Sequence, residues 1–275
     1  MMRSKCGMIV LILVAVLVLG VSLWGPERLA EYSDEQSLNQ VMEREAGDAG
    51  EGYRYIMSAD EKLSLLSKCL NSQSQPKSER NASIYQNNIN YGELAGAYAF
   101  VVNKQGPSEQ DITEKEIYAV CDEQLKELKL LGIIPDEVKE VNAASYDAVL
   151  YSAIDVLEPR NNISVWKVSL STNKKNADKS GRMLDAYIDA RTGKIYEFYV
   201  RTSTTWDKMN QDEMINAWAT YLALSAPTAY ESENPLLENT PYYAKYRFGE
   251  ATDTSTVVTL GFYEGINELY LKISR

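Results

Sequence analysis

The longest apolar run of the chain lies near its start, over residues 6–24 (CGMIVLILVAVLVLGVSLW), and contains no charged side chain. A helix of this length spans about 28 Å, close to the ~30 Å hydrocarbon core of a bilayer. Arg3 and Lys5 precede the run and acidic residues follow it, so we expect the N-terminus in the cytoplasm and the rest outside. Residues 1–25 are therefore predicted to form a cytoplasmic tip and a single-pass anchor. A cleaved signal peptide is the alternative, although its apolar core is usually only about 7–15 residues long.

Polar and apolar positions beyond the anchor predict a stalk and then a helix. Residues 26–57 are polar and contain glycine without a strong apolar stripe, which indicates a stalk. Ser58 and Glu61 form a capping box, and leucines at helical spacing follow them. A polar loop and a short strand at 97–102 complete the segment. We expect residues 58–110 to be a helical and irregular linker region that packs on the body.

The same order of elements then occurs twice. In residues 111–202 a helix at 114–131, which starts at the Thr113–Glu116 capping box and ends at Gly132, precedes antiparallel strands. These strands are expected at 145–154, 163–171 and, as a hairpin, 182–200. In residues 203–275 a helix at 207–224 precedes strands at 242–248, 256–263 and 268–273. The pattern predicts an α+β fold of two small units, which we expect to pack together because each is near the lower size for an independent core.

One hairpin of the first unit resembles a known family. The strand around Trp166 and the following strand, which ends in Asp-x-x-Thr-Gly-Lys-Ile, resemble the PepSY domain family. The matching residues are Trp166, Val168, Asp189, Thr192, Gly193, Lys194 and Ile195. The whole layout is similar to single-pass regulators of Gram-positive bacteria that carry tandem PepSY-like or cystatin-like domains. This resemblance implies a helix cradled by an antiparallel sheet, with a second PepSY-like unit at 203–275. It also implies regulation of an envelope sensor or peptidase more than catalysis.

The composition excludes several classes of function. The chain has no histidine, which removes Ser-His-Asp and Cys-His catalysis and His-ligated zinc. Only Arg3 and Lys5 of its 28 basic residues precede Pro26, so the part beyond the anchor has 26 basic and 39 acidic residues, a net charge of −13. This charge argues against nucleic acid. We expect no cofactor and no metal ion. Asp185 and Asp189 are four residues apart on a predicted strand, so their side chains point the same way and could act as an acid–base pair. Asp189 is more typical of a residue that forms the following turn.

Two cysteines, Cys69 and Cys121, fall on the apolar faces of predicted helices outside the membrane. They could form a disulfide between the two helices, or each could be a buried thiol. The spacing leaves both alternatives open.

Tyrosine is the aromatic residue in excess, with 19 copies. Among those on predicted strands we single out seven: Tyr196, Tyr199, Tyr242, Tyr243, Tyr246, Tyr263 and Tyr270. Tyrosine suits half-buried sheet faces and also binding surfaces, so these residues form the possible partner surface, together with an exposed edge strand. We therefore expect a non-catalytic interaction protein that is held in the membrane through residues 6–24 and acts on another envelope protein. The alternatives are a module that binds peptides or cell-wall fragments, and an envelope hydrolase that uses carboxylates.

Overall fold

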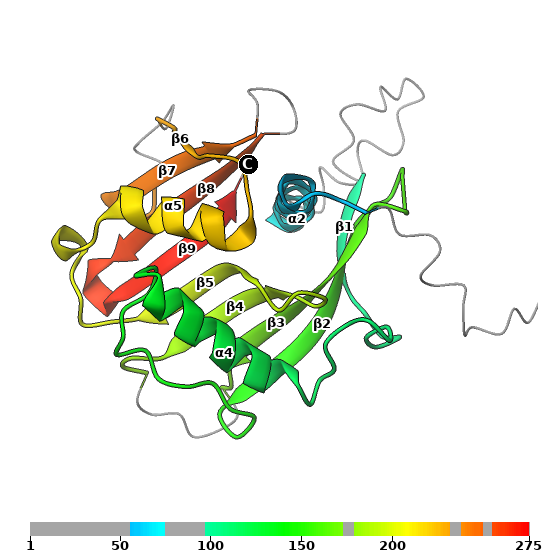
Figure 1. The fold of residues 1–275 in the computed structure, drawn as a ribbon, viewed down its shortest axis with the longest axis horizontal. Helices are drawn as coiled ribbons and strands as arrows, with labels where there is room; N and C mark the ends of the chain where they lie inside the picture. The colour runs from blue at the N-terminus through cyan, green and yellow to red at the C-terminus, as the bar shows by residue number, and fades with distance from the viewer. Residues whose placement is uncertain (1–55, 75–96, 173–178, 232–237, 250–254, 275) are drawn as a thin grey trace, which may run out of the picture. The chain divides into compact units, whose positions relative to one another are not determined.

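The computed structural model describes residues 56–74, 97–172, 179–231, 238–249 and 255–274 (Figure 1). All of them belong to one compact unit, Tyr53–Arg275. The predicted anchor at 6–24 lies outside the described residues, as do residues 26–55 of the predicted stalk. Within the described ranges, no helix is long and apolar enough to cross a membrane.

The described strands form one antiparallel sheet with the order β1-β2-β3-β4-β5-β9-β8-β7-β6. Their bounds are β1 Tyr98–Val102, β2 Tyr146–Asp155, β3 Asn162–Leu170, β4 Met183–Asp189, β5 Ile195–Arg201, β6 Thr228–Ala229, β7 Tyr242–Phe248, β8 Thr256–Tyr263 and β9 Glu268–Ser274. Each predicted strand is present within a residue or two of its expected ends, apart from the hairpin at 182–200, which resolves into β4 and β5. The protein therefore has the α+β class that the sequence predicts.

The α-helices of the described part are α2 (Ala59–Ser74), α4 (Ile117–Leu130) and α5 (Gln211–Leu222). The Ser58–Glu61 capping box is complete, whereas the Thr113–Glu116 box has only one of its two backbone bonds, from the Thr113 N–H to the Glu116 carboxylate. The Ser58 hydroxyl donates to the Glu61 carboxylate over 2.9 Å, and the Thr113 hydroxyl donates to the Glu116 carboxylate over 2.7 Å. Helix α4 nevertheless begins at Ile117, three residues after the expected start, because residues 114–116 form a turn.

Helix α5 is shorter than its prediction of 207–224. Asp207 lies in a separate 3-10 turn, Trp206–Lys208, and the side chain of Asn210 caps α5 by accepting from the N–H of Glu213. The helix ends at Ala223, whose left-handed φ of 57° turns the chain away. Asn210 is therefore the N-cap of α5.

The strands of the two predicted units join edge to edge. Strand β5 is the last strand of residues 111–202 and β9 the last of residues 203–275, and they pair from Phe198↔Leu271 to Arg201↔Glu268. Figure 1 shows the resulting continuous, curved sheet. Backbone hydrogen bonds between β5 and β9 therefore join the strands of the two predicted units into one sheet.

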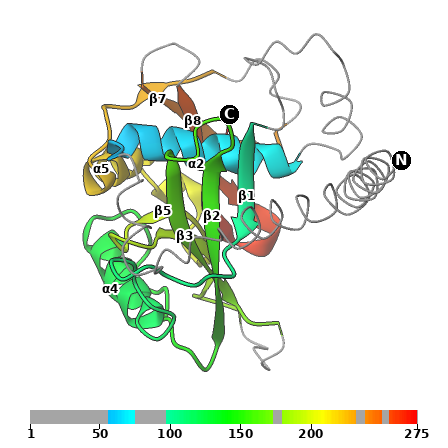
Figure 2. The same cartoon turned by 90° about the vertical axis from the view of Figure 1, so that its right-hand side faces the viewer.

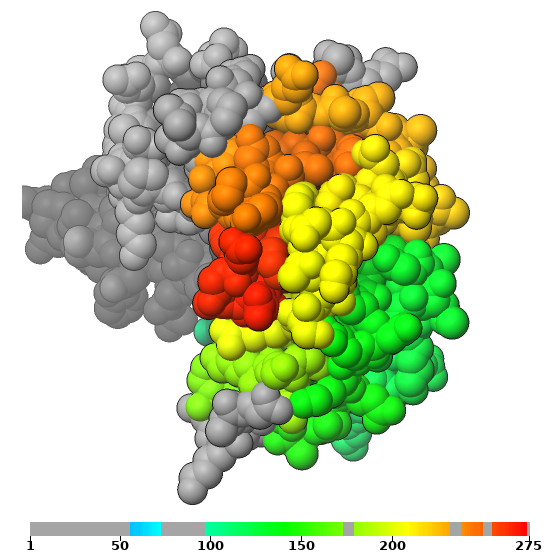
Figure 3. All heavy atoms as spheres, turned by 90° about the vertical axis from the view of Figure 1, so that its left-hand side faces the viewer, coloured from blue at the N-terminus to red at the C-terminus, as the bar shows by residue number. Residues whose placement is uncertain are grey.

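Helices α4 and α5 cover the same face of the sheet, whereas α2 contacts Asp189 and Tyr98, which the register places on the other face. The pairing register places Trp166 of β3, Leu271 of β9 and Phe248 of β7 on one face. The Trp166 indole donates to the carbonyl of Ile112, just before α4, and Trp218 of α5 packs edge-on against Phe248 at 5.5 Å. Figure 2 shows α2 crossing the strands, and Figure 3 shows α4 (green) and α5 (yellow) next to each other.

Helix α2 is part of the central core. Its Leu63 and Leu66 have no exposed surface, and the helix contacts β1, β2 and β3 on one side and β8 and β9 on the other. Full burial of a leucine contributes roughly 1.5–3 kcal/mol. The helical part of residues 58–110 therefore does more than pack on the outside of the body, because it joins strands from both predicted units.

Candidate functional site

The hairpin that resembles the PepSY family is organised around one buried carboxylate. Asp189 is 3% exposed and accepts hydrogen bonds from the N–H groups of Arg191 and Thr192 and from the Tyr196 hydroxyl. Its second oxygen lies 3.1 Å from the Lys62 ammonium of α2. Burial alone would raise the pKa of Asp189, but Lys62 and these hydrogen bonds hold it below its usual value. The residue fixes the turn and ties the hairpin to α2.

The turn that follows Asp189 packs closely on α4. Gly193 has a φ of +75°, and a Cβ at this position would lie 2.6 Å from Cγ1 of Val120. Lys194 forms an ion pair with Glu127 at 2.9 Å and lies over the Tyr221 ring at 4.1 Å. Only a glycine permits both this backbone conformation and this approach.

The remaining motif residues also pack between the hairpin and the helices. Val168 and Ile195 have no exposed surface, and Trp166 is held by its bond to Ile112. The Thr192 hydroxyl accepts from the N–H of Lys194 over 3.4 Å. The structure thus brings all seven motif residues into contact with the hairpin or its supporting helix, where each has a packing or turn-forming role.

Aromatic rings cross the sheet face opposite to α4 and α5. We call this set the tyrosine face, and its members are Phe100, Tyr151, Tyr187, Tyr199, Tyr263 and Tyr270. Phe100 stacks on Tyr151 at 4.7 Å and meets Tyr187 edge-on at 5.7 Å. Tyr270 stacks on Tyr199 at 5.8 Å and on Tyr263 at 4.9 Å. Two groups of rings therefore lie on strands β1, β2 and β4 and on strands β5, β9 and β8.

Charged groups lie between the two groups of rings. The Lys167 ammonium is 3.7 Å from the Asp185 carboxylate, and both side chains are partly exposed. Glu197 is 4% exposed, and burial raises its pKa to about 7, although the N–H of Ile273 and the ammonium of Lys272 act in the opposite direction. The tyrosine face thus combines apolar rings with a carboxylate that titrates near neutral pH.

The seven tyrosines of the predicted partner surface do not share one surface. The pairing register places Tyr199, Tyr243, Tyr263 and Tyr270 on the tyrosine face, and Tyr242 and Tyr246 on the face that α4 and α5 cover. Tyr196, Tyr246 and Tyr270 are buried, and the hydroxyl of Tyr246 donates to Asp212 of α5. Of these seven, only Tyr199, Tyr243 and Tyr263 are both on the tyrosine face and partly exposed.

The predicted pair of carboxylates does not converge on one point. Asp185 lies beside Lys167 and accepts from the hydroxyl of Ser169, whereas Asp189 caps its turn. Among the described residues no group of three His, Cys, Asp or Glu side chains is placed to hold a metal ion.

The cysteines are free and buried, which matches the buried-thiol alternative and not the disulfide. Cys69 lies against β2, with its Sγ 3.7 Å from the carbonyl oxygen of Ile154, and burial raises its pKa to about 12. Burial also raises the pKa of Cys121, on α4. Neither thiol ionises readily at neutral pH.

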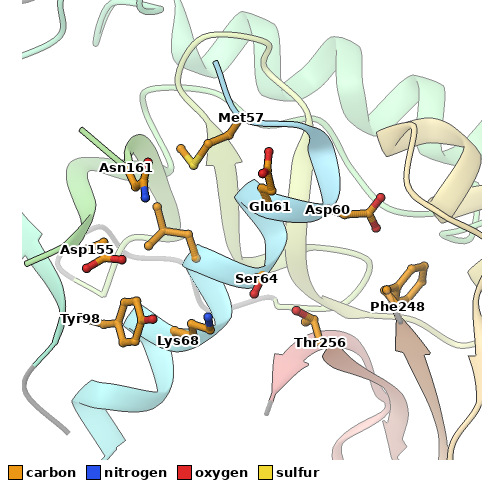
Figure 4. Close-up of a pocket in the computed structure, with 12 residues that line it drawn as sticks. Met57, Asp60, Glu61, Ser64, Lys68, Tyr98, Asp155, Asn161, Phe248 and Thr256 are labelled. Carbon is orange, nitrogen blue, oxygen red and sulfur yellow. The ribbon is translucent and has the colours of Figure 1, made fainter. Parts of the chain in front are cut away.

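A pocket of 390 Å³ lies beside α2, between β1, the β2–β3 loop and the ends of β7 and β8 (Figure 4). Its lining residues are Met57, Asp60, Glu61, Ser64, Leu65, Lys68, Tyr98, Asp155, Asn161, Phe248, Gly249 and Thr256. This site was not predicted from the sequence, because its residues come from five separate segments. The only local sequence signal for this pocket is the spacing of Ser64 and Lys68, which are four residues apart and so lie on one face of a helix.

No family model, curated protein or solved structure matches the chain. The likeness to the PepSY family therefore depends on the hairpin residues alone.

Proposed function

We propose that the protein is a non-catalytic interaction protein that binds another protein of the cell envelope through its tyrosine face. The single observation that carries this proposal is the row of aromatic rings across the side of the sheet opposite to α4 and α5. Tyrosine offers a large contact area at a small cost in side-chain entropy, and its hydroxyl tolerates water when no partner is bound. The Lys167–Asp185 pair and Glu197 add polar groups that can select a partner.

We propose that the protein is anchored in the membrane with its body outside the cytoplasm. The uncharged run at 6–24 and the flanking Arg3 and Lys5 support an anchor with the body outside the cytoplasm. We also propose that α4 with β2–β5, and α5 with β7–β9, are two PepSY-like units. The support for this division is the repeated order of one helix followed by antiparallel strands, together with the hairpin motif in the first unit.

Recovery of partners from membranes tests the proposal. The full chain should recover the same protein repeatedly, and the double variant Tyr199→Ser/Tyr263→Ser should recover at most about a tenth as much of it. The matched control is Tyr118→Ser, on α4 at the opposite side of the sheet, which should recover the wild-type amount. Circular dichroism melting shows whether each variant is folded. Equal recovery by the folded double variant would reject the tyrosine face as the binding surface.

A further inference from the structure

The pocket beside α2 contains two nearly buried hydroxyl groups. Ser64 is 8% exposed and Thr256 is 2% exposed, and both line the pocket. Within the described part of the chain, neither hydroxyl has a hydrogen-bond partner, and Figure 4 shows both directed into the space between α2 and β8. The pocket therefore offers polar groups that a ligand can satisfy.

The carboxylates of the pocket are partly engaged. Asp60 accepts from the N–H and hydroxyl of Ser225, and Glu61 accepts from Ser58 at the start of α2. Asp155 accepts from two backbone N–H groups in the β2–β3 loop through a single oxygen. Each carboxylate has further acceptor capacity for a cationic group.

One cation lies at the other end of the pocket. Lys68 is two turns of α2 beyond Glu61, and its ammonium lies 5.2 Å from the centre of the Tyr98 ring. It forms no ion pair with another described residue. Asp60 and Glu61 lie at one end of the pocket, whereas Asp155, the sheet partner of Tyr98, lies at the same end as Lys68 (Figure 4). Three carboxylates and one ammonium give the lining a net charge of −2, which disfavours a simple anion. A ligand with charges of both signs can satisfy Lys68 and the acidic end together.

The spacing of these charges sets the length of such a ligand. Glu61 and Lys68 are seven residues apart, so they lie about 10 Å apart along the helix. An extended peptide spans about 3.3 Å per residue, so three residues place an ammonium and a carboxylate at about this separation. Met57, Leu65 and Phe248 supply apolar surface between the ends. The volume of 390 Å³ lies within the range of small-ligand sites.

We propose that this pocket binds a short peptide of about three residues with both termini free. The ammonium lies at Asp60 and Glu61, the carboxylate at Lys68 and Tyr98, and an apolar side chain against Leu65 and Phe248. The hydroxyls of Ser64 and Thr256 bond to the peptide backbone. This site is separate from the tyrosine face, so either proposal can fail without the other.

Calorimetric titration of the full chain in detergent micelles tests this site. The probe is the tripeptide Ala-Leu-Ala with free ends, and it is compared with forms blocked at the N-terminus, the C-terminus or both. Blocking either end should weaken binding at least tenfold. Equal affinity for the free and doubly blocked peptides, or no binding of the free peptide at millimolar concentration, would overturn the proposal.

Variants test which end of the peptide lies at which end of the pocket. Lys68→Met should weaken binding of the free peptide at least tenfold and leave binding of the C-terminal amide unchanged. Lys126→Met, on the exposed side of α4, is the matched control and should bind like the wild type. Thr256→Val, which keeps the side-chain shape, should weaken binding at least threefold. Melting temperatures near that of the wild type establish that the variants fold. Wild-type affinity in folded Lys68→Met would contradict the proposed orientation.

Discussion

The carboxylate of Glu197 should make the stability of the protein depend on pH near neutrality. This side chain lies on the tyrosine face at 4% exposure, and its Oε2 accepts a hydrogen bond from the N–H of Ile273 over 3.0 Å. Burial raises its pKa from 4.5 to about 7. The substitution Glu197→Gln keeps the shape and the acceptor for Ile273 but removes the titration.

The sign and size of the effect follow from linkage. Because the folded state holds the proton more tightly than the unfolded state, the folded state binds more protons between pH 4.5 and about 7. The free energy of unfolding of the wild type therefore decreases as the pH rises through this window and stays lower above it. A change of about 2.5 pKa units corresponds to roughly 3 kcal/mol.

Urea unfolding of the full chain, followed by tryptophan fluorescence, measures this dependence. The free energy of unfolding of Glu197→Gln relative to the wild type should increase by roughly 3 kcal/mol between pH 4 and pH 8. The exposed Glu123→Gln of α4 serves as control and should show no comparable change. If the difference between Glu197→Gln and the wild type is constant over this range, the carboxylate is not buried in the way described.

Three further predictions concern the hairpin and the cysteines. Gly193→Ala should destabilise the protein by more than Gly106→Ala. Both glycines have a positive φ, which costs an alanine about 1–2 kcal/mol, but only at Gly193 would the added Cβ also meet a close neighbour. Equal losses of unfolding free energy in the two variants would refute this close contact. Asp189→Asn should cost about 3–5 kcal/mol in urea unfolding, since it leaves a partly buried ammonium without its partner, and a loss below 1 kcal/mol would contradict this role. Cys69 and Cys121 should react with a thiol reagent only after unfolding, and rapid labelling of the native protein would show that they are not buried.

Local sequence signals predicted the elements of the fold but not their arrangement. Capping boxes and apolar spacing placed α2 and α4, because these signals act within one turn of helix. The pairing of β5 with β9 joins residues about 70 positions apart, and no local pattern specifies which strand edges meet. The central position of α2 in the core was not predicted either, because it depends on contacts with strands that are distant in the sequence.

The seven tyrosines of the predicted partner surface were chosen without regard to the face of the sheet on which each side chain lies. Neighbouring residues of a strand point to opposite faces, so Tyr242 and Tyr243 could already have been assigned to different sides. Tyr151 and Tyr187 also lie on predicted strands but were not singled out, and Phe100 was missed because only tyrosines were considered. The pocket residues Ser64 and Thr256 carry no pattern at all, because only the folded sheet brings them together.

The central claim is that the protein binds its partner through the tyrosine face, and site-directed photo-crosslinking tests it most directly. A benzophenone side chain is introduced at Tyr199, at Tyr263, or at Tyr118 of α4 as control, and the full chain is irradiated in its native membrane. The account predicts that both positions on the tyrosine face crosslink to the same protein and that Tyr118 does not. Crosslinking from Tyr118 alone, or to unrelated proteins from Tyr199 and Tyr263, would contradict it.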